Sequence, residues 1–282
     1  MSGTVHREDV TIGGPAPLAG TLFRPGRAPR AAVVIHAATG TPAGFYHAFA
    51  EWLAAERGMA ALAYDYRGAG RSAPAPRATM SDWGIADQQA ARDWLAAALP
   101  DAPLWVVGHS LGGMMLPYQT GLDRVARTIC VASGAVHLSD HPWPYRAVAA
   151  SFWFGPAALA ARLLGRVPGR IAGLRGDVSI PAPAFRQWRT WCTDRRFHGA
   201  DPALPAPDAT ALGGPVRLVA VEDDALCPPR AVWRLGDRLY GGTMRERRSL
   251  APQGAAIGHH GVFRRAHARR WPDLVDAAPG AA

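Results

Sequence analysis

Five residues near the middle of the chain have the types and spacing of a nucleophile turn. Gly108, His109, Ser110, Leu111 and Gly112 follow an apolar run and precede a segment with helical character. A serine between two such glycines can occupy a tight turn from strand to helix that lifts its hydroxyl above a sheet. The N–H of the next residue then points at the oxyanion that forms in acyl transfer. We therefore take Ser110 as the candidate nucleophile and the Leu111 N–H as one oxyanion donor.

A serine hydroxyl becomes a good nucleophile only when an imidazole accepts its proton and a carboxylate holds that imidazole. Two acids, Asp223 and Asp224, come directly after the apolar run 216–221. Asp224 stands four residues before Pro228, which stops the loop. We expect Asp224 to be the acid of a catalytic triad, with Asp223 as the alternative.

Two adjacent histidines, His259 and His260, stand between glycines in a later loop. A histidine framed by glycines is poorly explained as core packing. The Gly-His step before the start of a helix favours His259 as the general base, with His260 as the alternative. The chain order of serine, acid and histidine is the order found in one group of hydrolases.

A second oxyanion donor is expected from the loop that follows the first central strand. That loop begins with His36, and its next residues are small, so a substrate can approach the backbone closely. We expect the Ala38 N–H to be this donor, with Ala37 and Thr39 as alternatives. Losing one such donor typically lowers a rate about a hundred- to a thousand-fold.

The elements that must position these residues alternate between strand and helix. Two antiparallel strands joined by a Gly-Gly-Pro turn are predicted at 5–12 and 19–23. Buried strands are predicted at 31–35, 59–64, 104–107, 128–131 and 216–221, and the alternation adds a strand at 244–250. Helical spacing predicts helices at 45–57, 83–99, 113–121 and 230–240, and a last helix from Val262. This alternation indicates a mostly parallel sheet of about eight strands flanked by helices.

The alternation stops in the middle of the chain. Residues 137–207 are rich in proline, glycine and tryptophan, with helix-like pieces at 145–164 and 184–191. We expect a helical lid inserted between two parts of one core, 1–136 and 208–282.

Composition narrows the class of protein. The chain has 282 residues with a net charge of +9, but all 31 basic residues are arginine, which indicates a coding bias rather than a nucleic-acid surface. We found no run of about 18 apolar residues and therefore expect no integral membrane segment. The polar N-terminus and three widely spaced cysteines predict a reduced, cytoplasmic protein without a disulfide framework or a metal site.

Beyond the nucleophile turn, three blocks resemble the α/β-hydrolase superfamily. They are residues 38–46, the Asp-x-Arg-Gly-x-Gly-x-Ser run at 65–72, and residues 258–264. The chain is most similar to bacterial α/β-hydrolases of the serine-aminopeptidase-like and lysophospholipase-like kinds. It departs from them in having His36-Ala37 where the superfamily usually has His-Gly. The resemblance implies the α/β-hydrolase fold.

These observations predict a cofactor-free serine hydrolase that acts on a small-molecule substrate. We expect it to cleave a small or medium carboxylic ester, or an amide, through Ser110, His259 and Asp224 and an acyl-enzyme intermediate. An acyltransferase with the same triad is one alternative. A non-catalytic ligand-binding protein on a hydrolase scaffold is another.

Overall fold

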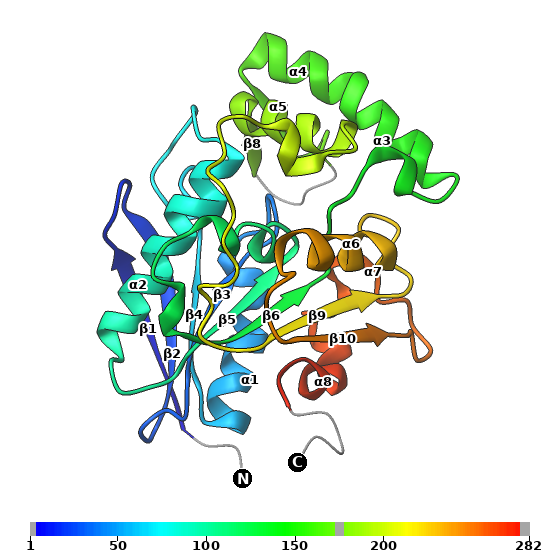
Figure 1. Ribbon diagram of the computed structural model, residues 1–282. Coiled ribbons are helices and arrows are strands. Elements are labelled where there is room, and N and C mark those ends of the chain that lie inside the picture. The colour runs from blue at the N-terminus through cyan, green and yellow to red at the C-terminus, as the bar shows by residue number, and fades with distance from the viewer. Residues whose placement is uncertain (1–3, 173–177, 277–282) are drawn as a thin grey trace.

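An eight-stranded sheet runs through the computed structural model, which describes residues 4–172 and 178–276 (Figure 1). Its strand order is β1-β2-β4-β3-β5-β6-β9-β10, with β1 and β2 antiparallel to their neighbours and the other pairs parallel. The strands are β1 (Val5–Ile12), β2 (Leu18–Pro25), β3 (Ala32–His36), β4 (Ala60–Tyr64), β5 (Leu104–His109), β6 (Val125–Val131), β9 (Val216–Val221) and β10 (Arg245–Leu250). The predicted mostly parallel sheet is confirmed.

Helices α1 (His47–Arg57), α2 (Gln88–Ala98) and α6 (Pro229–Leu239) pack against this sheet as the alternation predicts. The other helices are α3 (Tyr145–Phe154), α4 (Pro156–Leu164) and α5 (Ala182–Thr193) in the inserted segment, and the short α7 (Gly258–Gly261) and α8 (Trp271–Val275) after β10. Every residue of β3, β4 and β9 is buried, as expected for strands covered on both faces. Gly58 ends α1 with a left-handed φ of 62°.

The segment after the nucleophile turn differs from the prediction. Residues 113–121 form no α-helix, and two 3₁₀ turns, Ser110–Gly113 and Leu116–Tyr118, stand in its place. Pro117 lacks the N–H that a continuous helix would use, and its ring disfavours the preceding turn. The expected last helix is also broken, into α7, a 3₁₀ turn at Arg265–Arg270, and α8.

The C-terminal elements pack against α1. The rings of Phe49 and Trp271 lie 5.5 Å apart, and the Trp271 indole N–H donates to the Val262 carbonyl at 2.7 Å. This packing fixes the chain that follows the His259 loop.

The inserted segment lies between β6 and β9 in the chain. Figure 1 shows α3, α4 and α5 together at one end of the molecule, above the sheet, with the short strands β7 (Arg166–Pro168) and β8 (Ser179–Pro181). The Gln187 side chain bonds the Ser81 N–H and hydroxyl, in a segment that follows β4. The His141 ring bonds the Ala225 carbonyl after β9 at 3.0 Å. The segment is therefore tied to the carboxyl end of the sheet. Its action as a lid, and its exact limits at 137 and 207, stay predictions.

By length and composition, Tyr145–Leu164 is apolar enough to cross a membrane, a stretch that the search for a run of about 18 apolar residues missed. The expectation of no integral membrane segment stays a prediction. In the structure Gly155 has non-helical dihedral angles, and Pro156 starts a new helix. The run is therefore divided into α3 and α4, and each helix is much shorter than the roughly 20 residues that a span needs.

Two buried histidines make the fold sensitive to acid. Burial, with Arg92 adding to it at His36, lowers the pKa of His36 and His198 to about 3, against 6.5 when exposed. Below pH 6.5 these two histidines bind protons in the unfolded chain but stay neutral in the folded chain. The free energy of unfolding therefore falls as the pH falls. We expect the free energy of unfolding to decrease by about 1.4 kcal/mol per pH unit for each histidine towards pH 5. Urea denaturation at several pH values measures this slope. His36→Asn and His198→Asn should each reduce it, and an unchanged slope in both variants would contradict the assignment.

Candidate active site

Ser110 stands at a strained turn directly after β5. Its φ of 54° lies in the left-handed region that side-chain-bearing residues rarely adopt. A Cβ on Gly108 would lie 2.3 Å from the Gly112 carbonyl oxygen, and a Cβ on Gly112 would lie 2.1 Å from the His36 carbonyl oxygen. Both positions therefore require glycine, as the spacing predicts. The close approach of Gly112 also holds the turn against β3.

Leu111 occupies the second position of the 3₁₀ turn Ser110–Gly113. At this position a backbone N–H has no acceptor within the turn itself. The residue is fully buried, so its side chain anchors the turn while its N–H remains beside the serine. This is the placement that an oxyanion donor needs.

The second expected oxyanion donor is not free. The Ala38 N–H donates to the Tyr46 hydroxyl at 2.9 Å, so it is already engaged in this structure, and its role as an oxyanion donor stays a prediction. The Ala38 carbonyl is engaged as well, because it accepts from the Thr41 N–H at 3.1 Å. Within the described part of the chain neither alternative, the Ala37 N–H or the Thr39 N–H, has an acceptor. The loop therefore leaves both N–H groups available, and we use Thr39 in the mechanism proposed below.

Asp224 is the acid that reaches a histidine. Its Oδ2 accepts a hydrogen bond from His259 Nδ1 at 2.7 Å, and its Oδ1 accepts from the N–H groups of Leu226 and Cys227 at 2.9 and 2.8 Å. Burial alone would raise the pKa of Asp224, but the His259 ring and these two N–H groups hold it below the usual value. The carboxylate is therefore ionised and fixed in orientation.

Asp223, the alternative acid, has a different task. Its two carboxylate oxygens accept from the N–H groups of Ile257 and Gly258, at 2.8 and 2.9 Å. Gly258 has a left-handed φ of 58° and directly precedes His259. Asp223 therefore holds the backbone of the histidine loop, whereas Asp224 holds the ring.

The bond to Asp224 sets the chemistry of His259. Because Nδ1 donates to a carboxylate, Nε2 carries the lone pair that a general base needs. Among the described residues, Ser110 and His259 form no hydrogen bond with each other, a common condition of catalytic pairs without substrate. His260 instead lies 3.3 Å from the Thr41 hydroxyl through Nε2, and burial and the neighbouring His259 lower its pKa to about 4.

A buried relay that the sequence did not predict connects the two sides of this site. The His109 Nε2 lies 2.9 Å from the His259 carbonyl, which can only accept, so Nε2 carries the proton of the ring. Burial and the nearby histidines hold the pKa of His109 well below its usual value, so the ring is neutral and Nδ1 accepts. The Tyr46 hydroxyl, at 2.7 Å, must donate to that Nδ1, and it accepts from the Ala38 N–H.

Two further tyrosine hydroxyls hold the loop after β3. Tyr64 bonds His36 Nδ1 at 2.7 Å, and Tyr66 donates to the Ala37 carbonyl at 2.9 Å. Together with Tyr46, three buried hydroxyls, from β4, the segment after it and the turn that precedes α1, bind the last residue of β3 and the first two residues of the loop. The periodicity of these segments marks the tyrosines as core residues and carries no signal of this role.

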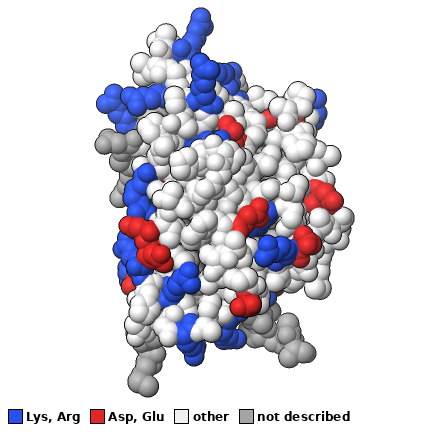
Figure 2. Space-filling model, turned by 90° about the vertical axis from the view of Figure 1, so that its left-hand side faces the viewer, with Lys and Arg blue, Asp and Glu red and all other residues white. Residues whose placement is uncertain are grey.

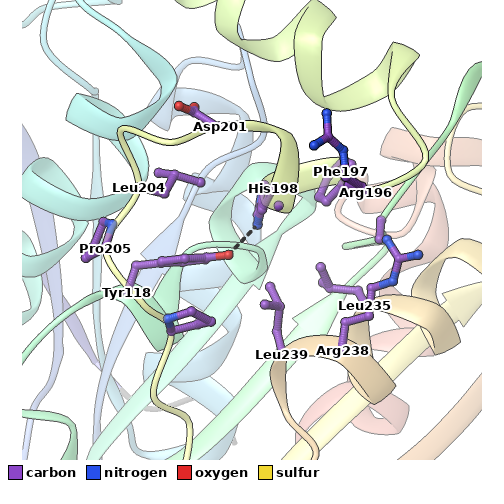
Figure 3. A pocket seen from close by; sticks show the side chains of 13 residues that line it. Tyr118, Arg196, Phe197, His198, Asp201, Leu204, Pro205, Leu235, Arg238 and Leu239 are labelled. Carbon is purple, nitrogen blue, oxygen red and sulfur yellow. Dashed lines mark hydrogen bonds between the residues drawn. The ribbon is translucent and has the colours of Figure 1, made fainter.

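A separate cavity of about 300 Å³ lies beside α6 (Figure 3). Segment 196–207 and α6 supply most of its lining, and Tyr118 and His198 meet in it through a 3.1 Å hydrogen bond. None of the predicted catalytic residues lines this cavity.

Comparison with known families gives one match that covers just over half of the chain. Residues 27–172 match the family described as serine aminopeptidase, S33. The matched range includes the nucleophile turn and the loop after β3, and it ends before Asp224 and His259. No curated protein sequence matches the chain.

Solved structures of low sequence identity share the fold. An esterase from Pyrococcus furiosus is 14% identical with a TM-score of 0.57, covering 96% of this chain and 89% of the other. A thermophilic esterase from Thermogutta terrifontis is 19% identical with a TM-score of 0.57, covering 95% and 96%. Alpha/beta hydrolase domain-containing protein 10 from mouse is 18% identical with a TM-score of 0.54, covering 92% and 93%.

The relay predicts an unequal effect of two buried hydroxyls on stability. Tyr46→Phe removes the partner of both the Ala38 N–H and His109 Nδ1, whereas Tyr118→Phe removes only the partner of His198 Nδ1. We expect the free energy of unfolding to fall by about 2–4 kcal/mol for Tyr46→Phe and by about 1–2 kcal/mol for Tyr118→Phe. Urea denaturation at neutral pH compares them. Equal losses would show that Tyr46 does not hold both groups.

Proposed function

The chain belongs to the serine aminopeptidase (S33) family of α/β hydrolases, and we propose that it is a serine hydrolase cleaving small or medium carboxylic esters. The observation that carries this proposal is the 2.7 Å bond between His259 Nδ1 and the buried Asp224, on loops that the sheet brings to the end where Ser110 stands. The sharp turn at Ser110 adds to it, because a strained serine with glycines on both sides is otherwise an unfavourable structure.

In the proposed mechanism Ser110 Oγ attacks the carbonyl carbon of the ester while His259 Nε2 accepts its proton. The Asp224 carboxylate stabilises the imidazolium that forms and keeps its ring oriented. The N–H groups of Leu111 and Thr39 bind the oxyanion. His259 then returns the proton to the leaving alkoxide, which leaves an acyl group on Ser110 Oγ. In the second half His259 Nε2 accepts a proton from water as the water attacks the acyl carbon, and it gives that proton to Ser110 Oγ as the bond to the acyl group breaks and the acid leaves.

An ester is the preferred substrate class for two reasons. Two of the structural neighbours are described as esterases. An ester also releases an alcohol, which needs less assistance from the general acid than the amine of an amide.

Loss of either proton-transfer partner should abolish turnover. We expect Ser110→Ala and His259→Ala each to lower kcat/KM for p-nitrophenyl butyrate by at least about 10⁴-fold, because these residues act as a unit. His260→Ala should retain activity within about tenfold of the wild type, because its ring contacts Thr41 and no carboxylate. Purified proteins are compared in a spectrophotometric assay, with circular dichroism to check folding.

Two outcomes would reject the proposal. One is equal rates in the wild type and Ser110→Ala. The other is a wild type that neither hydrolyses the ester nor reacts with a fluorophosphonate probe, which is the behaviour of a non-catalytic scaffold.

Substitution of the two neighbouring acids should lower kcat to very different extents. Asp224→Asn should lower kcat by about 10⁴-fold, because an amide favours the wrong tautomer of His259. Asp223→Asn should lower it by about tenfold or less, because one oxygen still accepts from the histidine loop. The pair is measured with the same ester. A larger loss in Asp223→Asn than in Asp224→Asn would reverse the assignment.

A further inference from the structure

Large apolar side chains are exposed mainly on the inserted helices. Of the seven large hydrophobic residues that are exposed in the described part of the chain, six lie between residues 143 and 164. They are Trp143 (78% exposed), Val148 (59%), Phe154 (56%), Leu159 (58%), Leu163 (69%) and Leu164 (61%). Such concentration on one part of a surface marks an interaction site.

The outward side of α4 carries larger apolar side chains than its inward side. The helix buries Ala157, Ala160 and Ala161, whereas Leu159 and Leu163 are exposed. An ordinary surface helix turns its larger apolar residues inward. The reversed order indicates that the leucines have a partner outside this chain.

The same segment carries positive charge without compensation. Residues 141–176 contain five arginines and no aspartate or glutamate. In the described structure Arg146, Arg162, Arg166 and Arg170 are all exposed and form no ion pair. Figure 2 shows blue side chains gathered at this end of the molecule.

Some arginines elsewhere in the protein have acidic partners. On β10, Arg245 and Arg247 pair with Asp237, and Arg248 pairs with Glu246. What distinguishes residues 141–176 is that their arginines stand with no acidic residue among them and beside the exposed apolar side chains.

The inner side of these helices is firmly packed. Phe152, Trp153, Phe185 and Trp188 form a cluster of edge-to-face and tilted ring contacts, with centroids 4.7–5.9 Å apart. The cluster joins α3 to α5 and leaves the outer side free. The apolar and basic outer side is thus presented on a rigid support.

We propose that α3 and α4 dock on the surface of a bilayer that contains anionic phospholipid. The exposed tryptophan, phenylalanine and leucines enter the boundary between headgroups and acyl chains, and the arginines contact lipid phosphates. The division at Gly155 fits helices that lie in the surface plane and do not span it. Docking in this way places the carboxyl end of the sheet, and with it the Ser110 site, towards the lipid.

Charge distinguishes this partner from a second copy of the chain. In a symmetric dimer formed through this surface the same arginines would face one another without acidic residues between them. An anionic bilayer offers both the apolar layer and the opposite charge.

Vesicle sedimentation tests the proposal without any turnover. The full chain and its Ser110→Ala variant are mixed with vesicles of phosphatidylcholine alone, or of equal parts phosphatidylcholine and phosphatidylglycerol. We expect both proteins to sediment with the anionic vesicles, to be released by added salt, and to bind neutral vesicles more than tenfold more weakly. Because Ser110→Ala binds as well, failure of the hydrolase proposal would not affect this result.

Matched variants separate the two contributions. Arg162→Gln/Arg166→Gln/Arg170→Gln should weaken binding to anionic vesicles by about a hundredfold, at about fivefold for each arginine close to the surface. Leu159→Ser/Leu163→Ser should weaken it to a similar extent through lost apolar contact. The control, Arg27→Gln/Arg30→Gln/Arg124→Gln, removes three exposed arginines at the opposite end of the sheet strands and should bind as the wild type does.

Three results would overturn the proposal. The first is wild-type protein that stays in solution with anionic vesicles. The second is an equal loss of binding in the control and in the inserted-helix variants. The third is a stable dimer in sedimentation velocity that Leu159→Ser/Leu163→Ser converts to a monomer, which would assign the surface to a second copy.

Discussion

The hydrogen bond between Asp224 and His259 is the interaction on which the proposed site depends. It joins loops that follow the last two strands of the sheet, 35 residues apart in the chain. A buried carboxylate is unfavourable unless its oxygens are all occupied, and here two backbone N–H groups and one imidazole occupy them. The ring is thereby oriented before any substrate arrives. The adjacent Asp223 supports the same arrangement from the backbone, so two neighbouring acids serve one histidine.

A second constraint is steric. Gly112 comes so close to His36 that a single methyl group would not fit, and this closeness locks the nucleophile turn to β3. The loop after β3 is in turn held by three tyrosine hydroxyls. The nucleophile and the oxyanion loop therefore share one rigid support. Small residues in that loop allow a substrate to approach the backbone closely. The hydrogen bonds from the tyrosine hydroxyls fix the position of this backbone, which small side chains alone would not.

Much of this arrangement could be predicted from residue types and spacing. Apolar runs located the central strands β3, β4 and β9, because strands buried on both faces have few polar residues. The edge strands β1 and β10 are largely polar and exposed, so their sequences carry no such signal. The glycines around Ser110 predicted a turn that the structure contains. The choice between Asp223 and Asp224 depended on loop geometry that the sequence does not encode locally. Ala38 was predicted as a donor from the small residues of its loop alone. The bond between its N–H and the hydroxyl of Tyr46, eight residues later, could not be predicted from any local pattern. The helix expected at 113–121 was wrong because apolar spacing outweighed Pro117.

The relay from Ala38 through Tyr46 and His109 to the His259 carbonyl couples the loop after β3 to the loop of the proposed catalytic histidine. Its direction is unique, since each group has only one way to give or take its hydrogen. The middle position needs a side chain that accepts on one side and donates on the other at a fixed separation, and few besides a neutral imidazole do so. Replacement of the His109 ring would therefore disturb the loop that holds Ala38 and the loop that holds His259 at the same time. The inserted helices lie outside this circuit, so a change in them leaves the orientation of the relay intact.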